Sequence, residues 1–252
     1  MNRELVSLAL ALQFLTRLPI NVGRHYSPEL FARSVRFYPL AGAFIGALGA
    51  VLYTLSAALL PHEIAVLCAV VGLLMVTGAF HEDGLADSFD GLGGGLDRTA
   101  KLRIMRDSRL GTYGTLAVVS TMAMRTAVLM ALPPSVVPWA LILAQSISRL
   151  SSVIVIASST YVRDEGTGKP VAQTMDGAAL VFALSSGGAL VLAASAVLDP
   201  AQLCMALLGL AVGHAVLRRW IENQIGGYTG DTLGAIQQIS ELGFLIGLLA
   251  WH

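Results

Sequence analysis

Long uncharged stretches constrain this chain more than any other feature of its sequence. Residues 37–60 contain no charged side chain, and as a helix they are long enough to cross the roughly 30 Å hydrocarbon core of a bilayer. Only 13% of the 252 residues are charged, whereas soluble domains average about 25%. The sequence therefore predicts an all-α, polytopic integral membrane protein.

Seven apolar stretches alternate with short turns and longer polar segments, which predicts one helical bundle over residues 1–252 and no separate soluble domain. Gln237, Gln238 and Glu241 interrupt the last stretch, so we expect six transmembrane helices, or seven if this stretch also crosses the membrane. The expected spans are 37–60, 64–80, 110–132, 139–162, 177–198, 201–217 and 233–251.

Basic residues indicate how these helices are oriented. Fourteen of the 16 Lys and Arg residues fall in the polar segments 1–36, 81–109, 163–176 and 218–231, and the intervening turns hold none. Positive charge favours the cytoplasmic side, so we expect all four segments to face the cytoplasm of a bacterial or archaeal cell. Within the first segment, leucines recur at helical spacing over residues 5–15, which is typical of an amphipathic helix in the membrane interface.

The second polar segment opens with a dense group of ionisable residues. Asp83, Asp87 and Asp90 stand at i, i+4 and i+7, so a helix would place their carboxylates on one face. Like charges at this spacing repel, and oxygen ligands on one face suit Mg²⁺ or Mn²⁺. We expect a divalent-metal site, with a solvated acidic turn as the alternative. The preceding His81 is a candidate ligand or general base, or an ordinary interfacial histidine.

A basic stretch closes the same segment. Arg106 and Arg109 can each hold a phosphate or carboxylate bidentately. Ser108, Thr112 and the glycines around Thr112 can present hydroxyl and backbone N–H groups to an anion near a helix start. Asp107 lies within this stretch. The alternative interpretation is juxtamembrane positive charge that only maintains topology.

A glycine-rich loop in the last polar segment has similar features. Glycines let a backbone approach a phosphate closely, and the candidate phosphate-binding residues are Gly226, Gly227, Thr229 and Gly230. Asp231 is a candidate metal ligand or a cap of the following helix. The loop matches neither the dinucleotide-binding nor the Walker A pattern.

Two arginines and two cysteines lie inside expected spans. Arg125 and Arg149 are costly in lipid and must face the protein interior or a water-filled cavity. They either pair with Glu241 or an acid of residues 81–90, or neutralise a substrate phosphate. Cys68 and Cys204 are expected to be small buried hydrophobic residues rather than a disulfide.

Carboxylates, arginines and glycine-rich turns on one membrane face together indicate metal-dependent phosphoryl transfer. The formal net charge of zero argues against a nucleic-acid partner. An ion-coupled transporter is a remote alternative, because it predicts carboxylates near mid-membrane, whereas these lie near the ends of the spans.

Three motifs in order, residues 80–91, 104–114 and 226–235, resemble cobalamin synthase, also called adenosylcobinamide-GDP ribazoletransferase. Residues 12–19 and the arrangement of apolar stretches along the chain also resemble this family. Arg106 stands where the family more often has lysine. The resemblance implies the last assembly stage of coenzyme B12 at the cytoplasmic membrane. There, the 5′-hydroxyl of α-ribazole, or of its 5′-phosphate, would attack the cobinamide-bound phosphate of adenosylcobinamide-GDP, and GMP would leave.

The resemblance also assigns roles to the candidate residues and implies Mg²⁺ (or Mn²⁺) as cofactor. It implies other B12-assembly enzymes as further partners in the lipid bilayer. The expected metal ligands are Asp83, Asp87, Asp90 and Asp231, the expected proton-transfer groups are His81, Glu82 and Asp107, and the basic stretch and glycine-rich loop would hold phosphates. Residues 83–86 also echo the start of the CDP-alcohol phosphotransferase motif. Asp87 replaces an arginine of that motif and its later acidic spacing is missing, so this family is the second-ranked enzyme class.

Overall fold

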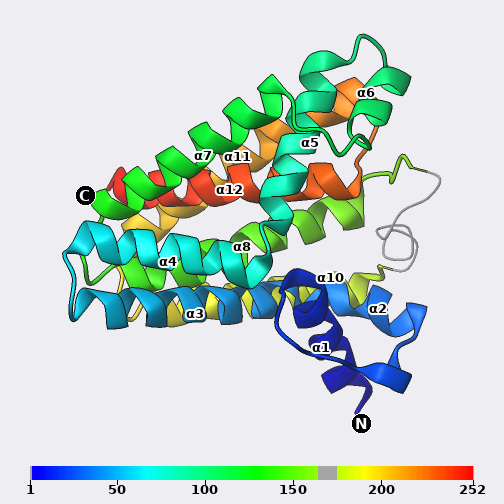
Figure 1. Cartoon of the computed structure of the whole chain (residues 1–252). Coiled ribbons are helices and arrows are strands. Elements are labelled where there is room, and N and C mark those ends of the chain that lie inside the picture. Colours follow the sequence, from blue (N-terminus) through cyan, green and yellow to red (C-terminus); the bar gives the residue numbers. More distant parts are fainter. Residues whose placement is uncertain (1, 164–174, 252) are drawn as a thin grey trace.

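The computed structural model describes residues 2–163 and 175–251, and helices make up most of this part of the chain (Figure 1). The helices are α1 (Arg3–Leu15), α2 (Pro28–Ser34), α3 (Tyr38–Ala57), α4 (His62–Thr77), α5 (Phe80–Gly94), α6 (Arg98–Ile104), α7 (Thr112–Ala131), α8 (Val137–Ser158), α10 (Gly177–Ala194), α11 (Pro200–Ile225) and α12 (Gly230–Leu249). Short 3-10 turns occupy Gly23–His25 and Val35–Phe37. The predicted all-α class is confirmed.

Within the described residues, six helical stretches are long and apolar enough to cross a bilayer: Pro28–Ala57, α7, α8, α10, α11 and α12. Helices α4 and α5 meet the same criterion only as a pair, bent by 83° at the break between them, which makes up to seven. The range of six to seven predicted spans is confirmed. Helix α12 is apolar enough to qualify although it contains Gln237, Gln238 and Glu241, and these three side chains are buried inside the bundle.

Closely packed glycines determine which helices form the centre of the bundle. Helix α8 is the most enclosed candidate span, with 83% of its most apolar window buried. Gly42 and Gly46 of α3 lie directly against the α8 backbone, and Gly209 of α11 faces Gly243 of α12 in the same way, so a Cβ at any of these positions would meet backbone atoms. Small residues allow such close approach between membrane helices, where packing replaces the hydrophobic effect as the driving force.

A sharp turn between α4 and α5 directs the acidic motif across the bundle. Gly78 and Ala79 both adopt left-handed backbone conformations, with φ of 65° and 55°, and this conformation costs a non-glycine residue about 1–2 kcal/mol. The N-terminal segment supports the turn, because the Arg17 backbone N–H donates to the Val76 carbonyl at 2.7 Å. As a result, α5 leaves the direction of α4 and packs against α12.

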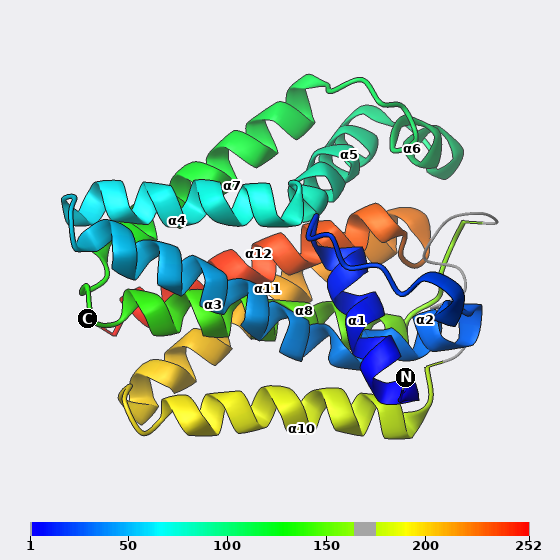
Figure 2. The ribbon, with the colours of Figure 1, turned by 60° about the horizontal axis from the view of Figure 1, so that its bottom comes forward.

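The polar segments gather at one end of the bundle, as Figures 1 and 2 show. Helices α1 and α2, helices α5 and α6, and the turn between α11 and α12 lie at this end, whereas the turns after α3 and α7 and the C-terminus lie at the other. The common end expected from the charge pattern is confirmed, and its cytoplasmic orientation stays a prediction. Residues 164–174 of the predicted segment 163–176 lie outside the described residues.

The two cysteines are free, and one of them is exposed. Cys68 is half-buried, whereas Cys204 lies exposed on α11, so the expectation that both are buried is wrong for Cys204. An apolar run does not distinguish the interior of a membrane bundle from its lipid-facing surface, because both are apolar.

Candidate active site

The acidic motif forms helix α5, the conformation in which the sequence spacing places its three aspartates on one face, but these aspartates lie in different environments. Asp83 is exposed, Asp87 is half-buried and Asp90 is buried. Among the described residues, neither the Asp83 nor the Asp87 carboxylate makes a hydrogen bond, and both carboxylates lie close enough to Asp231 to repel it. Asp83 and Asp87 are therefore available to a ligand.

Asp90 instead holds the start of helix α7. Its Oδ2 accepts a hydrogen bond from the Gly111 N–H at 2.7 Å, and its Oδ1 accepts one from the Gly114 N–H at 2.8 Å. Both glycines lie directly against this carboxylate, leaving no room for a Cβ. The backbone N–H groups of Gly111 and Gly114 at this helix start therefore bind a carboxylate of the protein itself.

Two glycines bring the acidic motif against the last polar segment. A Cβ on Gly84 of α5 would lie 2.7 Å from the Asp231 carbonyl oxygen, and one on Gly234 of α12 would lie 3.1 Å from the His81 carbonyl oxygen. The two helices therefore meet backbone to backbone at this crossing. This contact places Asp231 beside Asp83, although 148 positions separate them in the sequence.

Asp231 pairs with Arg163, a residue that the sequence analysis did not single out. The Arg163 Nη2 atom lies 2.6 Å from Asp231 Oδ2, with both side chains mostly buried. A β-bridge between Tyr161 and Tyr228 holds the segment before Arg163 next to the glycine-rich loop. Gly227 is required at this bridge, because a Cβ there would meet the Thr160 carbonyl. Arg163 was the first basic residue after an expected span, and only this long-range pairing distinguishes it from other basic residues.

The glycine-rich loop ends in a helix cap made by threonines. Thr229 accepts a hydrogen bond from the Thr232 N–H at 3.3 Å, and its own N–H donates to Thr232 Oγ1 at 2.8 Å. Thr229 is fully buried. It therefore caps α12, a role that the sequence analysis considered for Asp231. Gly226 has φ of 76°, a left-handed conformation that favours glycine at the end of α11.

The basic stretch lies at the exposed rim of this end. Asp107 and Arg109 form an ion pair of 2.6 Å between Oδ2 and Nη2, and hydrogen bonds from Arg109 lower the pKa of the Asp107 carboxyl. Arg106, Ser108 and Thr112 are exposed. These residues are free to meet a large ligand that approaches from the aqueous side.

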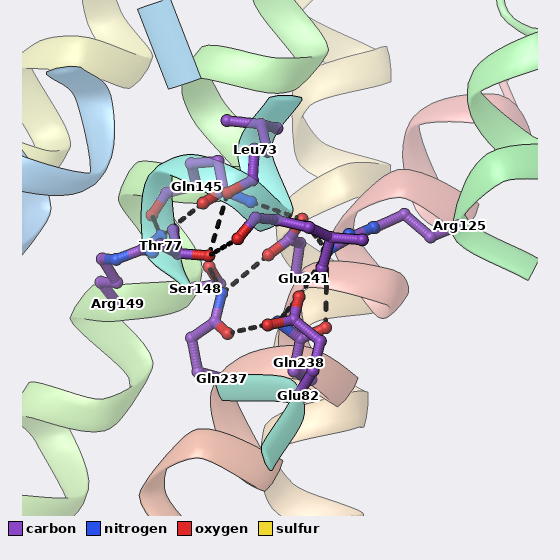
Figure 3. A network of polar contacts seen from close by, with 11 residues as sticks. Leu73, Thr77, Glu82, Arg125, Gln145, Ser148, Arg149, Gln237, Gln238 and Glu241 are labelled. Atoms are coloured by element: carbon purple, nitrogen blue, oxygen red, sulfur yellow. Dashed lines mark hydrogen bonds and ion pairs between the residues drawn. The ribbon is translucent and has the colours of Figure 1, made fainter. Parts of the chain in front are cut away.

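Glu82 belongs to a buried polar network (Figure 3). Arg125 Nη1 lies 3.5 Å from Glu82 Oε1 and 3.3 Å from Glu241 Oε1, which confirms the predicted pairing of Arg125. Arg149 donates to the carbonyl and side-chain oxygens of Gln145 at 2.8 and 2.7 Å. Two arginines and two glutamates balance, as burial of charge in a membrane interior requires.

Amide side chains complete this network. Gln145 and Gln237 each donate to Glu241 at 2.7 Å, and Gln238 donates to Glu82 at 3.1 Å. The polar residues that interrupt the predicted last span are therefore the partners of the buried charges. They bind α12 to α5, α7 and α8.

A cavity of about 120 Å³ opens beside the acidic cluster. Helices α1, α3, α5 and α8 and the start of α12 enclose it, so it combines residues from both halves of the chain. Its lining includes Phe14, Leu15, Tyr38, Phe80, His81, Asp83, Gly84, Arg149, Ser152, Ile156, Tyr228, Gly230, Asp231, Leu233 and Gly234. Burial raises the pKa of Tyr228 to about 12, so its hydroxyl stays protonated at neutral pH.

Comparison with known proteins identifies the family. The family model described as cobalamin-5-phosphate synthase matches residues 7–249. The chain belongs to the cobalamin-5-phosphate synthase family. A protein of Shewanella amazonensis named adenosylcobinamide-GDP ribazoletransferase is 40% identical over 99% of this chain and 97% of its own length. A protein of the same name from Leptothrix cholodnii is 40% identical over 96% of this chain and 94% of its own length. No solved structure matches the chain significantly.

This membership confirms the resemblance based on residues 80–91, 104–114 and 226–235, and it makes the chain a membrane-embedded transferase. The side chains of this cobalamin-5-phosphate synthase family member indicate how the expected metal ion could be held. Among the described residues, no three His, Cys, Asp or Glu side chains form a ready metal-binding group. Mg²⁺, however, is commonly held by one or two carboxylates together with substrate phosphates and water. Asp83 and Asp87, whose carboxylates lack hydrogen bonds, fit that mode of Mg²⁺ binding.

Proposed function

We propose that this protein joins adenosylcobinamide-GDP to α-ribazole or α-ribazole 5′-phosphate, giving adenosylcobalamin or its 5′-phosphate and GMP. The observation that carries this proposal is the crossing of α5 and α12, which gathers Asp83, Asp87 and Asp231 next to Arg163 and a cavity. Such a cluster offers acidic groups for a cation and a basic group for phosphate on one face of the protein.

In this proposal Asp83 and Asp87, with Asp231 nearby, would hold Mg²⁺, which Mn²⁺ can replace. When bound, the ion neutralises charge that develops on the phosphate during transfer. We leave Asp90 out of the ligand set, because its carboxylate oxygens accept the hydrogen bonds that start α7. Arg163 would hold the phosphate, and Arg106 and Arg109 would contact the larger substrate at the rim.

The reaction exchanges a phosphoanhydride bond for a phosphodiester bond. A ribose hydroxyl oxygen bonds to the phosphorus that carries cobinamide, the bond from that phosphorus to the bridging oxygen breaks, and GMP leaves with the electron pair. The 5′-oxygen of α-ribazole 5′-phosphate is already esterified, so we replace the expected 5′-hydroxyl with a secondary ribose hydroxyl, which both acceptors possess. The hydroxyl proton passes to His81, which lines the cavity.

Two other predicted proton-transfer groups receive no such role in this proposal. Glu82 is held by Arg125 and Gln238 in the buried network, and we assign it to positioning α5. Asp107 is paired with Arg109 at the exposed rim. The proposed location is the cytoplasmic (inner) membrane with the site towards the cytoplasm, which the basic polar segments at this end support.

The test is turnover by purified protein in detergent or vesicles, with adenosylcobinamide-GDP, α-ribazole 5′-phosphate and either Mg²⁺ or EDTA. We expect GMP and the corrinoid product, followed by mass, only with the metal. Asp83→Asn and Asp87→Asn should abolish turnover, whereas Asp199→Asn should not, because Asp199 caps α11 at the opposite end of the bundle and asparagine caps equally well. Normal turnover by Asp83→Asn and Asp87→Asn would refute the metal assignment.

A further inference from the structure

The cavity beside the acidic cluster has one wall of aromatic rings. Phe14 of α1, Tyr38 of α3 and Phe80 of α5 all line it. The ring centroids of Phe14 and Phe80 lie 5.0 Å apart in an edge-to-face arrangement, and those of Phe14 and Tyr38 lie 6.3 Å apart with nearly parallel planes. Aromatic side chains in these geometries bind a further flat ring by stacking or edge contact.

Two residues of the lining each carry a buried hydrogen-bond donor that has no acceptor within the described part of the chain. The two donors are Arg149 Nε and the Tyr228 hydroxyl, and both residues are only 1% exposed. Arg149 is held in place through Nη1, which donates twice to Gln145. A buried donor without a partner is costly, so native proteins usually pair it with a protein group, water or a ligand. These two donors indicate a ligand that brings an acceptor into an otherwise apolar space.

The acidic residues define the open direction of the same cavity. Asp83 and Asp231 both line it, and Asp83 is exposed. A ligand whose flat ring lies among the aromatic residues would therefore place its polar part next to the groups that we propose to act on phosphate.

We propose that this cavity binds the heteroaromatic base of the nucleoside acceptor, with its ribose towards Asp83 and Asp231. This inference rests on the proposed function. The volume of about 120 Å³ is comparable to the roughly 150 Å³ of an apolar cavity that binds benzene, so the cavity accepts a small flat ring system and excludes a corrin macrocycle. A benzimidazole-type base presents one free ring nitrogen, which accepts a single hydrogen bond. We assign the Tyr228 O–H as its donor and leave the Arg149 Nε–H to a water molecule or a ribose oxygen.

The same lining disfavours the guanine of the other substrate. Guanine carries several donors and acceptors on its edges, and each would need a partner in a buried site. Away from its two aspartates, the lining adds to Arg149 and Tyr228 only three further polar side chains, those of Tyr38, His81 and Ser152, and it includes the apolar Leu15, Ile156 and Leu233. The cavity therefore selects for a base with few polar atoms.

Binding of α-ribazole without a phosphate, measured by equilibrium dialysis on the full-length protein in detergent, tests this assignment. Tyr228→Phe removes only the hydroxyl and should weaken binding by about three- to tenfold, the size of one neutral hydrogen bond. Tyr161→Phe is the matched control, because its ring lies 5.5 Å from that of Tyr228 but does not line the cavity. The control should bind α-ribazole as the unmodified protein does.

A second pair of variants blocks the cavity without disturbing the fold. Gly230 is the first residue of α12 and lines the cavity, and a Cβ there meets no atom within 4 Å. Gly177 is the first residue of α10 and is equally open. We expect Gly230→Val to weaken α-ribazole binding at least tenfold, whereas Gly177→Val should leave α-ribazole binding unchanged.

The outcomes separate this inference from the proposed function. Turnover by the unmodified protein, combined with normal α-ribazole binding by both Tyr228→Phe and Gly230→Val, would overturn the cavity assignment and leave the reaction standing. Effective competition by guanosine for the α-ribazole site would also overturn it. A folded, unmodified protein that neither binds α-ribazole nor forms GMP would refute the proposed function and this inference with it.

Discussion

Replacing Gly84 by alanine tests whether the contact between α5 and α12 positions the acidic cluster. The new Cβ would lie 2.7 Å from the Asp231 carbonyl oxygen and 3.1 Å from its Cα, whereas ordinary contacts begin at 3.4 Å. Because both neighbours are backbone atoms, neither can rotate away. The difference between 3.4 and 2.7 Å requires the two helices to separate by about 0.7 Å.

That displacement should impair activity more than stability. Overpacking of this kind costs about 1–3 kcal/mol, and misplacing catalytic groups by about 1 Å can reduce a rate by roughly a hundredfold. We therefore expect Gly84→Ala to remain folded in detergent with a lowered unfolding temperature, and to release GMP from adenosylcobinamide-GDP about 30- to 100-fold more slowly.

Gly94→Ala provides the matched control on the same helix. Its Cβ would lie 3.6 Å from Ile104 Cδ1, an ordinary contact, and alanine has the higher helix propensity. This variant should keep its activity and its unfolding temperature. If Gly84→Ala released GMP as fast as Gly94→Ala, the α5–α12 contact would not position the site, and our explanation for the glycine would be refuted.

Three further predictions follow from the site and the buried network. Asp90→Asn should lower stability by about 1–3 kcal/mol in thermal unfolding, because the amide can accept only one of the two backbone hydrogen bonds at the start of α7. Glu241→Gln should lower the free energy of unfolding by about 3–5 kcal/mol, because it leaves buried arginine charge uncompensated. The double variant Glu241→Gln with Arg125→Met should recover part of that loss. A double variant less stable than Glu241→Gln would contradict the charge-balance argument. Arg163→Gln should slow turnover yet tighten Mn²⁺ binding by roughly fivefold in electron paramagnetic resonance titrations, because the guanidinium no longer competes for Asp231. Weaker Mn²⁺ binding would show that Arg163 does not compete with the cation for this carboxylate.

The sequence by itself determined the features that depend on local pattern. The low charge content and apolar run lengths predicted six to seven spans, and the positions of Lys and Arg predicted that the polar segments share one end. The spacing of Asp83, Asp87 and Asp90 showed that a helix would place these three residues on one face. These inferences succeed because helix periodicity and the cost of burying charge in lipid act on each segment separately.

Only the tertiary structure decided which of these residues meet. Asp90 has the same sequence character as Asp87, yet it bonds to the start of α7, because the loop after α6 returns the chain to it. Glu82 adjoins the acidic cluster in sequence but faces Arg125 on the other side of α5.

Arg163 shows most clearly what sequence pattern leaves open. It pairs with Asp231 only because a β-bridge joins Tyr161 to Tyr228 across 67 positions. The cavity is likewise assembled from α1, α3, α5, α8 and α12. Such long-range contacts follow from how rigid helices pack against one another, and glycine contacts like that of Gly84 with α12 set the separation of the helices. A local pattern therefore shows which residues can serve a site, and the packing of the helices selects those that do.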